Sequence, residues 1–437
     1  MDDATLMARD AAQPAAGRER LLMVSSDCHA SPRIAAYEEF MESRYHGELK
    51  SYAEALAQKS LSTTDLRAQG NKKDARGRTP EEIEEENRRR KHFATDLPAR
   101  IAPLEADGFV SEVLFPDGGA NNQIPFAGLF GNPAGFPTEL HAAALRAHNR
   151  WATATATPEQ QVGLGLVPLH DPDYAVAQVE GMRNQILRGV LVIWDGMDPA
   201  YPGLDDARLD RFWAACVDAG LPVHFHFGSG APAFYADARK LIQPALMFET
   251  VWWSHRPLWH LILGGVAERH PGLKVVFAET RYDWVPRVLQ YIDWEWEGGK
   301  LAHLPMKPSL YWARQFYVGA TTPSLIEHGL RHELGVDRCM YGTDFPHVSS
   351  PWGISTEFLQ ATLRPSGYTE SETRAFLGGI AADLYGLDTA RLRPIADRVG
   401  PYLDQLLTTP DGDAAKAAIE SKNVGIHRAV DRPHSMF

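Results

Sequence analysis

Four short stretches of the sequence carry side chains that bind metals or move protons. Asp27-Cys28-His29 follows an apolar run from Leu21 to Val24, and Pro222-Val223-His224-Phe225-His226 carries two histidines at the same spacing. Glu279 and Asp344 end two further apolar runs. Residues spaced two apart share one face of a strand, so each pair directs both side chains the same way. Carboxylates and imidazoles at the ends of parallel strands predict a divalent metal site.

A catalytic ion needs a shell that leaves one coordination position open. Two imidazoles and two carboxylates suit this need, and the candidates are Asp27, His29, His226 and Asp344. His226 is favoured over His224 because it lies nearer the carboxyl end of its run, and a buried core histidine is the alternative for either residue. The run that ends at Trp194 carries no lysine, which argues against a carbamylated lysine bridging two ions. We therefore expect one divalent ion.

The elements that position these residues follow from the pattern of apolar residues. Eight short apolar runs predict strands: Leu21–Ser26, Val110–Pro116, Val162–Leu169, Gly189–Trp194, Pro222–Phe227, Lys274–Glu279, Phe316–Ala320 and Cys339–Asp344. Amphipathic segments predict helices at Thr138–Thr157, Tyr174–Leu187, Asp206–Ala219, Trp259–Arg269, Trp284–Glu297, Ser324–Glu333 and Thr369–Tyr385. This alternation predicts an α/β fold, a (β/α)8 TIM barrel; a doubly wound sheet is the alternative, but no Gly-x-Gly-x-x-Gly turn follows the first run.

One connection is far longer than the others. We expect an N-terminal tail (1–20), a single barrel (21–387) with an insertion of about 31–100 after the first strand, and a C-terminal extension (388–437) that wraps the barrel or a partner. Thr79-Pro80-Glu81-Glu82 predicts a helix start. The run Arg88 to Lys91 is expected to be a solvated helix face. The insertion should shield the pocket or meet a second subunit, and the expected assembly is a homodimer.

Composition excludes several classes of partner. The net charge of −12 and the pI of about 5.8 disfavour nucleic acid and anionic membranes. The three cysteines are odd in number and far apart, which is typical of a reducing compartment. The first twenty residues lack the layout of a signal peptide, and no later stretch is apolar enough to span a bilayer. These features predict a cytoplasmic protein.

Several motifs in order resemble a known superfamily. Ser26–His29, Pro222–Gly228, His270–Glu279 and Tyr341–His347 together resemble the amidohydrolase superfamily, specifically the amidohydrolase-related branch that includes aminocarboxymuconate-semialdehyde decarboxylase. The resemblance covers roughly Leu21 to Leu387. It implies a distorted TIM barrel with one divalent ion, zinc being favoured and manganese the alternative, held by Asp27, His29, His226 and Asp344.

Two residues depart from the pattern of this superfamily. The first motif is Asp-x-His at Asp27, where many members have His-x-His. Glu279 ends the sixth run, where many members carry a histidine. The role of that histidine therefore does not transfer to Glu279.

The residues and the resemblance predict a mononuclear metal-dependent hydrolase that cleaves an amide, ester or activated C–C bond of a small aromatic or apolar substrate. Asp344 is expected to take a proton from metal-bound water. Glu279 is expected to protonate the leaving group. The alternatives are that it orients a water, binds a polar substituent of the substrate, or forms an ion pair with Arg281. A metal-dependent non-oxidative decarboxylase of an aromatic or unsaturated acid is the second hypothesis. A non-catalytic metal-stabilised binding protein is the third.

Residues around the expected pocket indicate the substrate class. Arg281 is the expected anchor for a carboxylate or phenolate, because its planar guanidinium suits such anions. Trp252 and Trp284 are expected to line an apolar rim. His224 and His347 complete the expected substrate-binding set.

Overall fold

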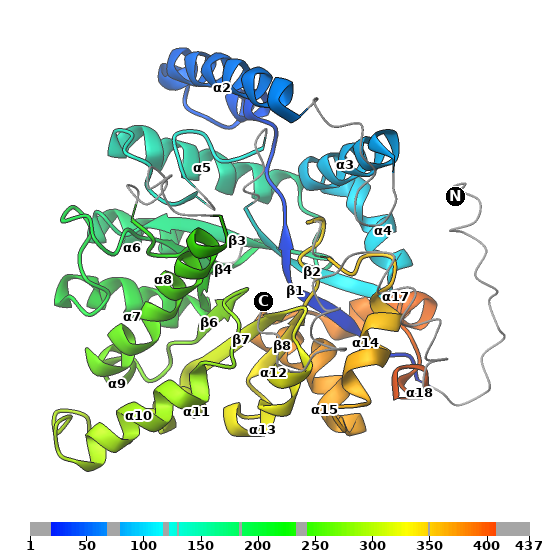
Figure 1. The fold of residues 1–437 in the computed structure, drawn as a ribbon. Coiled ribbons are helices and arrows are strands. Elements are labelled where there is room, and N and C mark those ends of the chain that lie inside the picture. Colours follow the sequence, from blue (N-terminus) through cyan, green and yellow to red (C-terminus); the bar gives the residue numbers. More distant parts are fainter. Residues whose placement is uncertain are drawn as a thin grey trace.

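The protein folds as a parallel eight-stranded barrel (Figure 1). A computed structural model describes residues 19–67, 79–116, 122–128, 131–182, 186–232, 243–347 and 350–407. The strands are β1 (Met23–His29), β2 (Phe109–Phe115), β3 (Gln161–Pro168), β4 (Leu187–Ile193), β5 (Val223–His226), β6 (Val275–Ala278), β7 (Phe316–Thr321) and β8 (Cys339–Gly342). They pair in sequence order, and the predicted (β/α)8 barrel is confirmed.

Helices fill the connections between the strands and the chain that follows β8. They are α2 (His46–Arg67), α3 (Pro80–Thr95), α4 (Ile101–Ala106), α5 (Thr138–Thr155), α6 (Pro172–Gly181), α7 (Asp210–Ala219), α8 (Gln243–Leu263), α9 (Val266–Arg269), α10 (Val285–Glu297), α11 (Pro308–Gln315), α12 (Leu325–Gly329), α13 (Arg331–Leu334), α14 (Ser355–Leu363), α15 (Glu370–Arg374), α16 (Ile380–Leu384), α17 (Thr389–Val399) and α18 (Leu403–Leu407). Among the described residues, no helix is both long and apolar enough to cross a membrane.

Two predicted helices were misplaced. The helix expected at Tyr174–Leu187 ends at Gly181, and Leu187 already belongs to β4. The helix expected at Trp259–Arg269 begins much earlier, as α8, and breaks before α9. In both places apolar residues resume a few positions beyond the boundary, so periodicity alone does not locate it.

Alternation along the strands separates the two faces of the barrel wall. Phe225 of β5 and Phe277 of β6 pack with the helices in one buried cluster. Val276 of β6 and Met340 of β8 belong to a second buried cluster that also contains Val24 of β1. Because side chains alternate between faces, His224 and His226 point away from Phe225, toward the barrel interior.

The last and first strands meet at a seam. The amide of His29 donates to the carbonyl of Phe345 over 2.7 Å, and the amide of Asp344 donates to the carbonyl of Asp27 over 2.9 Å. These bonds lie beyond the end of β8, where the chain has already left the regular strand. They bring Asp344 beside the β1 residues that carry the first metal-binding motif.

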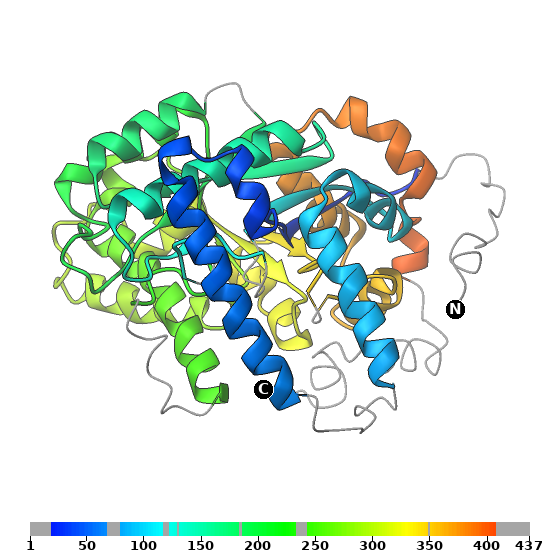
Figure 2. The same ribbon diagram turned by 90° about the horizontal axis from the view of Figure 1, so that it is seen from above.

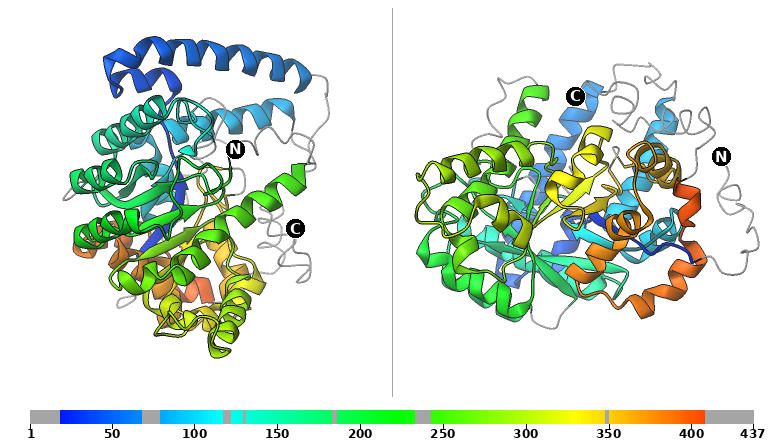
Figure 3. Two further views of the ribbon diagram at one scale, coloured as in Figure 1. Left: turned by 90° about the vertical axis from the view of Figure 1, so that its left-hand side faces the viewer. Right: turned by 90° about the horizontal axis from the view of Figure 1, so that it is seen from below.

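The long connection after β1 packs on the barrel. Figures 2 and 3 show α2, α3 and α8 extending past the barrel on the same side. The predicted start of α3 is confirmed, since Thr79 and Glu82 form a reciprocal capping box. At the other end of the chain, Leu392 and Ala396 of α17 are buried against the barrel. The predicted boundaries between tail, barrel and extension remain a prediction.

Candidate metal centre

Strand β1 delivers two fully buried candidate ligands. Asp27 and His29 are both 0% exposed. The Nδ1–H of His29 donates to the carbonyl of Pro116 over 3.0 Å, which directs the Nε2 lone pair toward Asp27. His29 Nε2 lies 3.5 Å from Asp27 Oδ1.

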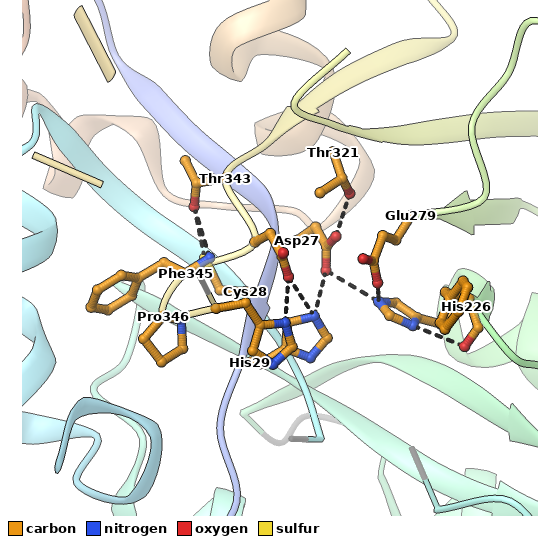
Figure 4. A network of polar contacts seen from close by, with 12 residues as sticks. Asp27, Cys28, His29, His226, Glu279, Thr321, Thr343, Phe345 and Pro346 are labelled. Atoms are coloured by element: carbon orange, nitrogen blue, oxygen red, sulfur yellow. Dashed lines mark hydrogen bonds and ion pairs between the residues drawn. The ribbon is translucent and has the colours of Figure 1, made fainter. Parts of the chain in front are cut away.

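Strand β5 supplies the second imidazole. The Nδ1–H of His226 donates to the carbonyl of Phe227 over 3.3 Å, so its Nε2 also faces the site. This Nε2 lies 3.4 Å from Asp27 Oδ1 and 3.5 Å from Glu279 Oε2. Figure 4 shows Asp27, His29, His226 and Glu279 directed toward one another.

Two more carboxylates enter from turns that follow their strands. Glu279 comes directly after β6 and Asp344 two residues after β8, and both have left-handed backbones, with φ of 51° and 60°. Such a conformation costs about 1–3 kcal/mol for a residue other than glycine. Asp344 Oδ1 lies 3.2 Å from His29 Nε2. Strained turns thus direct both carboxylates at the imidazoles.

The donor set fits a divalent ion. One ligand atom each from Asp27, His29, His226 and Glu279 lie within 4.8 Å of one another, and a second such group joins His29 to Asp344 and His347. Asp27 Oδ1 and Glu279 Oε2 are buried and find no hydrogen-bond partner among the described residues. Nitrogen–oxygen separations of 3.2–3.5 Å exceed the 2.7–2.9 Å typical of charge-assisted hydrogen bonds. An ion among these atoms would satisfy all of them.

The close approach of the carboxylates perturbs their titration. Burial, followed by the charges of Asp344 and Asp27, raises the pKa of Glu279 well above its usual range. Burial alone would also raise the pKa of Asp344, but the imidazoles of His347 and His29 outweigh it and lower that pKa. The site therefore concentrates negative charge beside two histidines.

His347 lies at the mouth of the site. Its side chain is 28% exposed, and its Nδ1 is 2.7 Å from Asp344 Oδ1. Its ring stacks on His29 at a centroid distance of 4.1 Å. The structure thus places His347 beside Asp344 and His29, where its hydrogen bond orients Asp344.

His224 does not join the group. Its Nδ1–H donates to the carbonyl of Val190 over 3.1 Å, and its Nε2 accepts from the hydroxyl of Tyr385 over 2.8 Å. Burial lowers its pKa to about 3. These contacts make His224 a neutral core histidine, so the prediction that it binds substrate is not supported.

The expected anion anchor and aromatic rim lie on the β6–α10 connection and on α8. Arg281 pairs with Asp283 over 3.1 Å and lies 3.9 Å from Glu327; no pair joins it to Glu279. Trp284 stacks on His255 at 3.9 Å. Trp252 is 58% exposed.

Two side chains that contact the candidate site were not predicted from the sequence. Thr321 ends β7, and its hydroxyl donates to Asp27 Oδ2. Arg100 is 0% exposed and pairs with the equally buried Glu112 over 2.7 Å. A glutamate inside the apolar run around Val110 was a usable signal, because a buried charge needs a partner.

Comparison with known proteins identifies the family. The sequence model of the amidohydrolase family matches residues 119–387. The chain belongs to the amidohydrolase family. No protein among the curated sequences matches this amidohydrolase.

Solved structures share its fold. An amidohydrolase from Mycobacterium avium subsp. paratuberculosis K-10 superposes with a TM-score of 0.61 at 20% identity, covering 84% of this chain and 99% of that one. The 5-carboxyvanillate decarboxylase LigW from Sphingomonas paucimobilis gives a TM-score of 0.57 at 16% identity, with coverage of 84% and 99%. The corresponding enzyme from Novosphingobium aromaticivorans DSM 12444, complexed with manganese and 4-hydroxy-3-methoxy-5-nitrobenzoic acid, gives 0.55 at 17%, with coverage of 84% and 96%.

Proposed function

We propose that this amidohydrolase is a mononuclear metal-dependent hydrolase that cleaves an amide, ester or activated C–C bond of a small aromatic or apolar substrate. The observation that carries the proposal is a pair of overlapping groups beyond the carboxyl ends of the strands: Asp27, His29, His226 and Glu279 form one, and His29 joins Asp344 and His347 in the other. Asp27, His29, His226 and Asp344 would hold the ion. When bound, a divalent ion supplies a Lewis acid that polarises a carbonyl oxygen and acidifies water.

The protein's own side chains would move the protons. Asp344 is oriented by His347 and would accept a proton from the attacking water. Glu279 approaches the site from the neighbouring turn, next to His226, and would return a proton to the leaving group. Arg281, Trp252 and Trp284 remain the proposed contacts for the remote part of the substrate.

A specific observation favours a second function. Two of the structures that share the fold are named 5-carboxyvanillate decarboxylases, and metal-dependent decarboxylation of an aromatic or unsaturated acid would use the same ligands. Turnover in ¹⁸O-labelled water separates the two reactions. Hydrolysis places solvent oxygen in a product carboxylate, whereas release of stoichiometric carbon dioxide without incorporation establishes the lyase. For hydrolysis, we also expect Glu279→Gln to slow substrates with poor leaving groups more than those with good ones.

The ion and the assembly need their own measurements. Zinc is the ion expected from the family resemblance, while the carboxylate oxygens of Asp27 and Asp344 are donors that also suit manganese. Elemental analysis, followed by reconstitution of metal-free protein with each ion, tests this choice and the expected stoichiometry of one. The homodimer remains a prediction that light scattering during size-exclusion chromatography would check, and the cytoplasmic location remains a prediction too.

A further inference from the structure

Arg100, at the end of the insertion after β1, forms hydrogen bonds with the chain on both sides of the seam between β1 and β8. Its Nη1 donates to the carbonyl of His29 over 2.7 Å, and its Nη2 donates to the carbonyl of Phe345 over 3.2 Å. The guanidinium also lies 4.8 Å from the centroid of the Phe345 ring. Glu112 balances the buried charge. One arginine therefore holds the backbone of a candidate ligand and that of the residue after Asp344.

Arg90, on helix α3 of the same insertion, reaches the next two residues of that loop. Its Nη1 donates to the carbonyl of Pro346 over 2.6 Å and to that of His347. Its side chain is only 8% exposed and pairs with Glu86, whereas that of Arg88 is 66% exposed. The expected solvated face is thus correct for Arg88 and wrong for Arg90.

The two arginines cap three consecutive carbonyls directly after Asp344. A guanidinium presents several donors in a fixed plane, so it can fix carbonyls whose direction a flexible ammonium would leave free. Phe93, between the two arginines in sequence, packs its ring 5.9 Å from that of Phe345. The loop that carries Asp344 is therefore supported by the insertion as well as by the barrel.

We propose that Arg90 and Arg100 are positioning residues, and that the insertion is a structural part of the metal site. By holding the carbonyls around His29 and Asp344, they set the spacing of two ligands before the ion binds. The proposal rests on the metal site of the proposed function. Because linkage is reciprocal, metal binding must in turn stabilise α3 against opening.

Metal affinity of the full-length protein tests the proposal without any substrate. The variants are Arg90→Met, its conservative counterpart Arg90→Lys, and the matched control Arg88→Met from the same helix. Dissociation constants for Zn²⁺ and Mn²⁺ come from competition with a chromogenic chelator, and urea unfolding of the metal-free proteins reports any general loss of stability. Changes to groups that orient ligands typically weaken metal binding about 10–100-fold.

We expect Arg90→Met to weaken metal binding about 10-fold or more, Arg90→Lys to recover part of the loss, and Arg88→Met to stay within about twofold of the parent. Hydrogen exchange supplies a second readout: metal should slow exchange of the α3 amides and leave those of α10 unchanged. The double variant Arg100→Met with Glu112→Met extends the test without leaving a buried charge unpaired.

The outcomes separate a failure of the proposed metal site from a failure of the positioning role of Arg90. Wild-type protein that binds no divalent ion defeats the proposed function itself. Wild-type protein that binds metal, together with an Arg90→Met variant of equal affinity and unchanged exchange in α3, defeats only the positioning role. Weakened binding in Arg90→Met with unchanged unfolding of the metal-free protein supports it.

Discussion

A substitution at Thr321 tests the candidate metal centre without changing any of the proposed ligands. Its hydroxyl donates to Oδ2 of Asp27, while Oδ1 of the same carboxylate faces His29 and His226 at 3.5 and 3.4 Å. Figure 4 shows this bond on the far side of Asp27 from the other ligands. Thr321→Val removes the donor and keeps the shape of the side chain.

The expected loss in free energy of unfolding follows from the burial of the Asp27 carboxylate, which accepts this hydrogen bond. Asp27 is 0% exposed, so no water replaces the lost donor, and a hydrogen bond to a charged group is worth about 1.5–3 kcal/mol. We expect the metal-free Thr321→Val protein to lose free energy of unfolding in that range. Metal binding should weaken about 10–100-fold, because Asp27 is no longer held in place.

Urea unfolding of the metal-free protein and chelator competition measure the two effects. Thr321→Ser is the matched control: it retains the hydroxyl and loses only a methyl group, so its metal affinity should stay close to that of wild type. Equal affinities for Thr321→Val and wild type would refute the reasoning. So would a larger loss in Thr321→Ser, which would assign the role to packing.

Further changes test the ligands, the proton transfer and the buried histidines. Asp27→Ala and His226→Ala should each bind far less than one ion per chain, and a full ion by elemental analysis in both would contradict the ligand assignment. Asp344→Asn should keep the fold and appreciable metal but lose about 10²–10⁴-fold in turnover, as expected for a general base; near-normal rates with metal bound would move that role elsewhere. Burial lowers the pKa of both His148 and His328 to about 3, so the unfolded chain binds more protons than the folded one between pH 3 and 6.5. The contribution of each neutral histidine to the free energy of unfolding is therefore fully present above pH 6.5. It is lost on acidification, by about 2 kcal/mol per histidine from pH 8 to pH 5. His148→Gln should make the free energy of unfolding, measured by urea titration, depend less steeply on pH, and an unchanged dependence would exclude the contribution of His148.

The barrel was predictable because its signals are local. Runs such as Val190-Leu191-Val192-Ile193 are short, rich in β-branched residues and buried on both faces, as strands of a parallel barrel must be. Parallel strands that follow one another bring their carboxyl ends to one face. This rule alone, applied to Asp27, His226, Glu279 and Asp344, predicted that the residues would converge, and the structure brings them together.

The supporting contacts were not predictable, because they join residues far apart in sequence. Nothing local distinguishes Arg90 from Arg88, yet only Arg90 meets the loop after β8. His224 and His226 are two residues apart, as Asp27 and His29 are, so spacing does not show that His224 lies outside the site. The pairing of His224 with Tyr385 depends on how the chain after β8 returns to the barrel. Arg281 finds acidic partners in Asp283 and Glu327 in place of Glu279. Such choices depend on tertiary packing, which periodicity does not encode.

Charge and strain together indicate that the site is built around a cation and not for stability. Asp27, Glu279 and Asp344 belong to two largely buried groups that share His29. Burial and the charges of Asp344 and Asp27 raise the pKa of Glu279, because like charges repel where water screens them poorly. Two of the three also have left-handed backbones, which adds strain. Asp27 and Glu279 are moreover the two positions at which this chain carries a carboxylate where many members of the superfamily carry histidine. Both departures place a carboxyl group beside His226, and a divalent cation would relieve the repulsion between them and use the strained geometry at once.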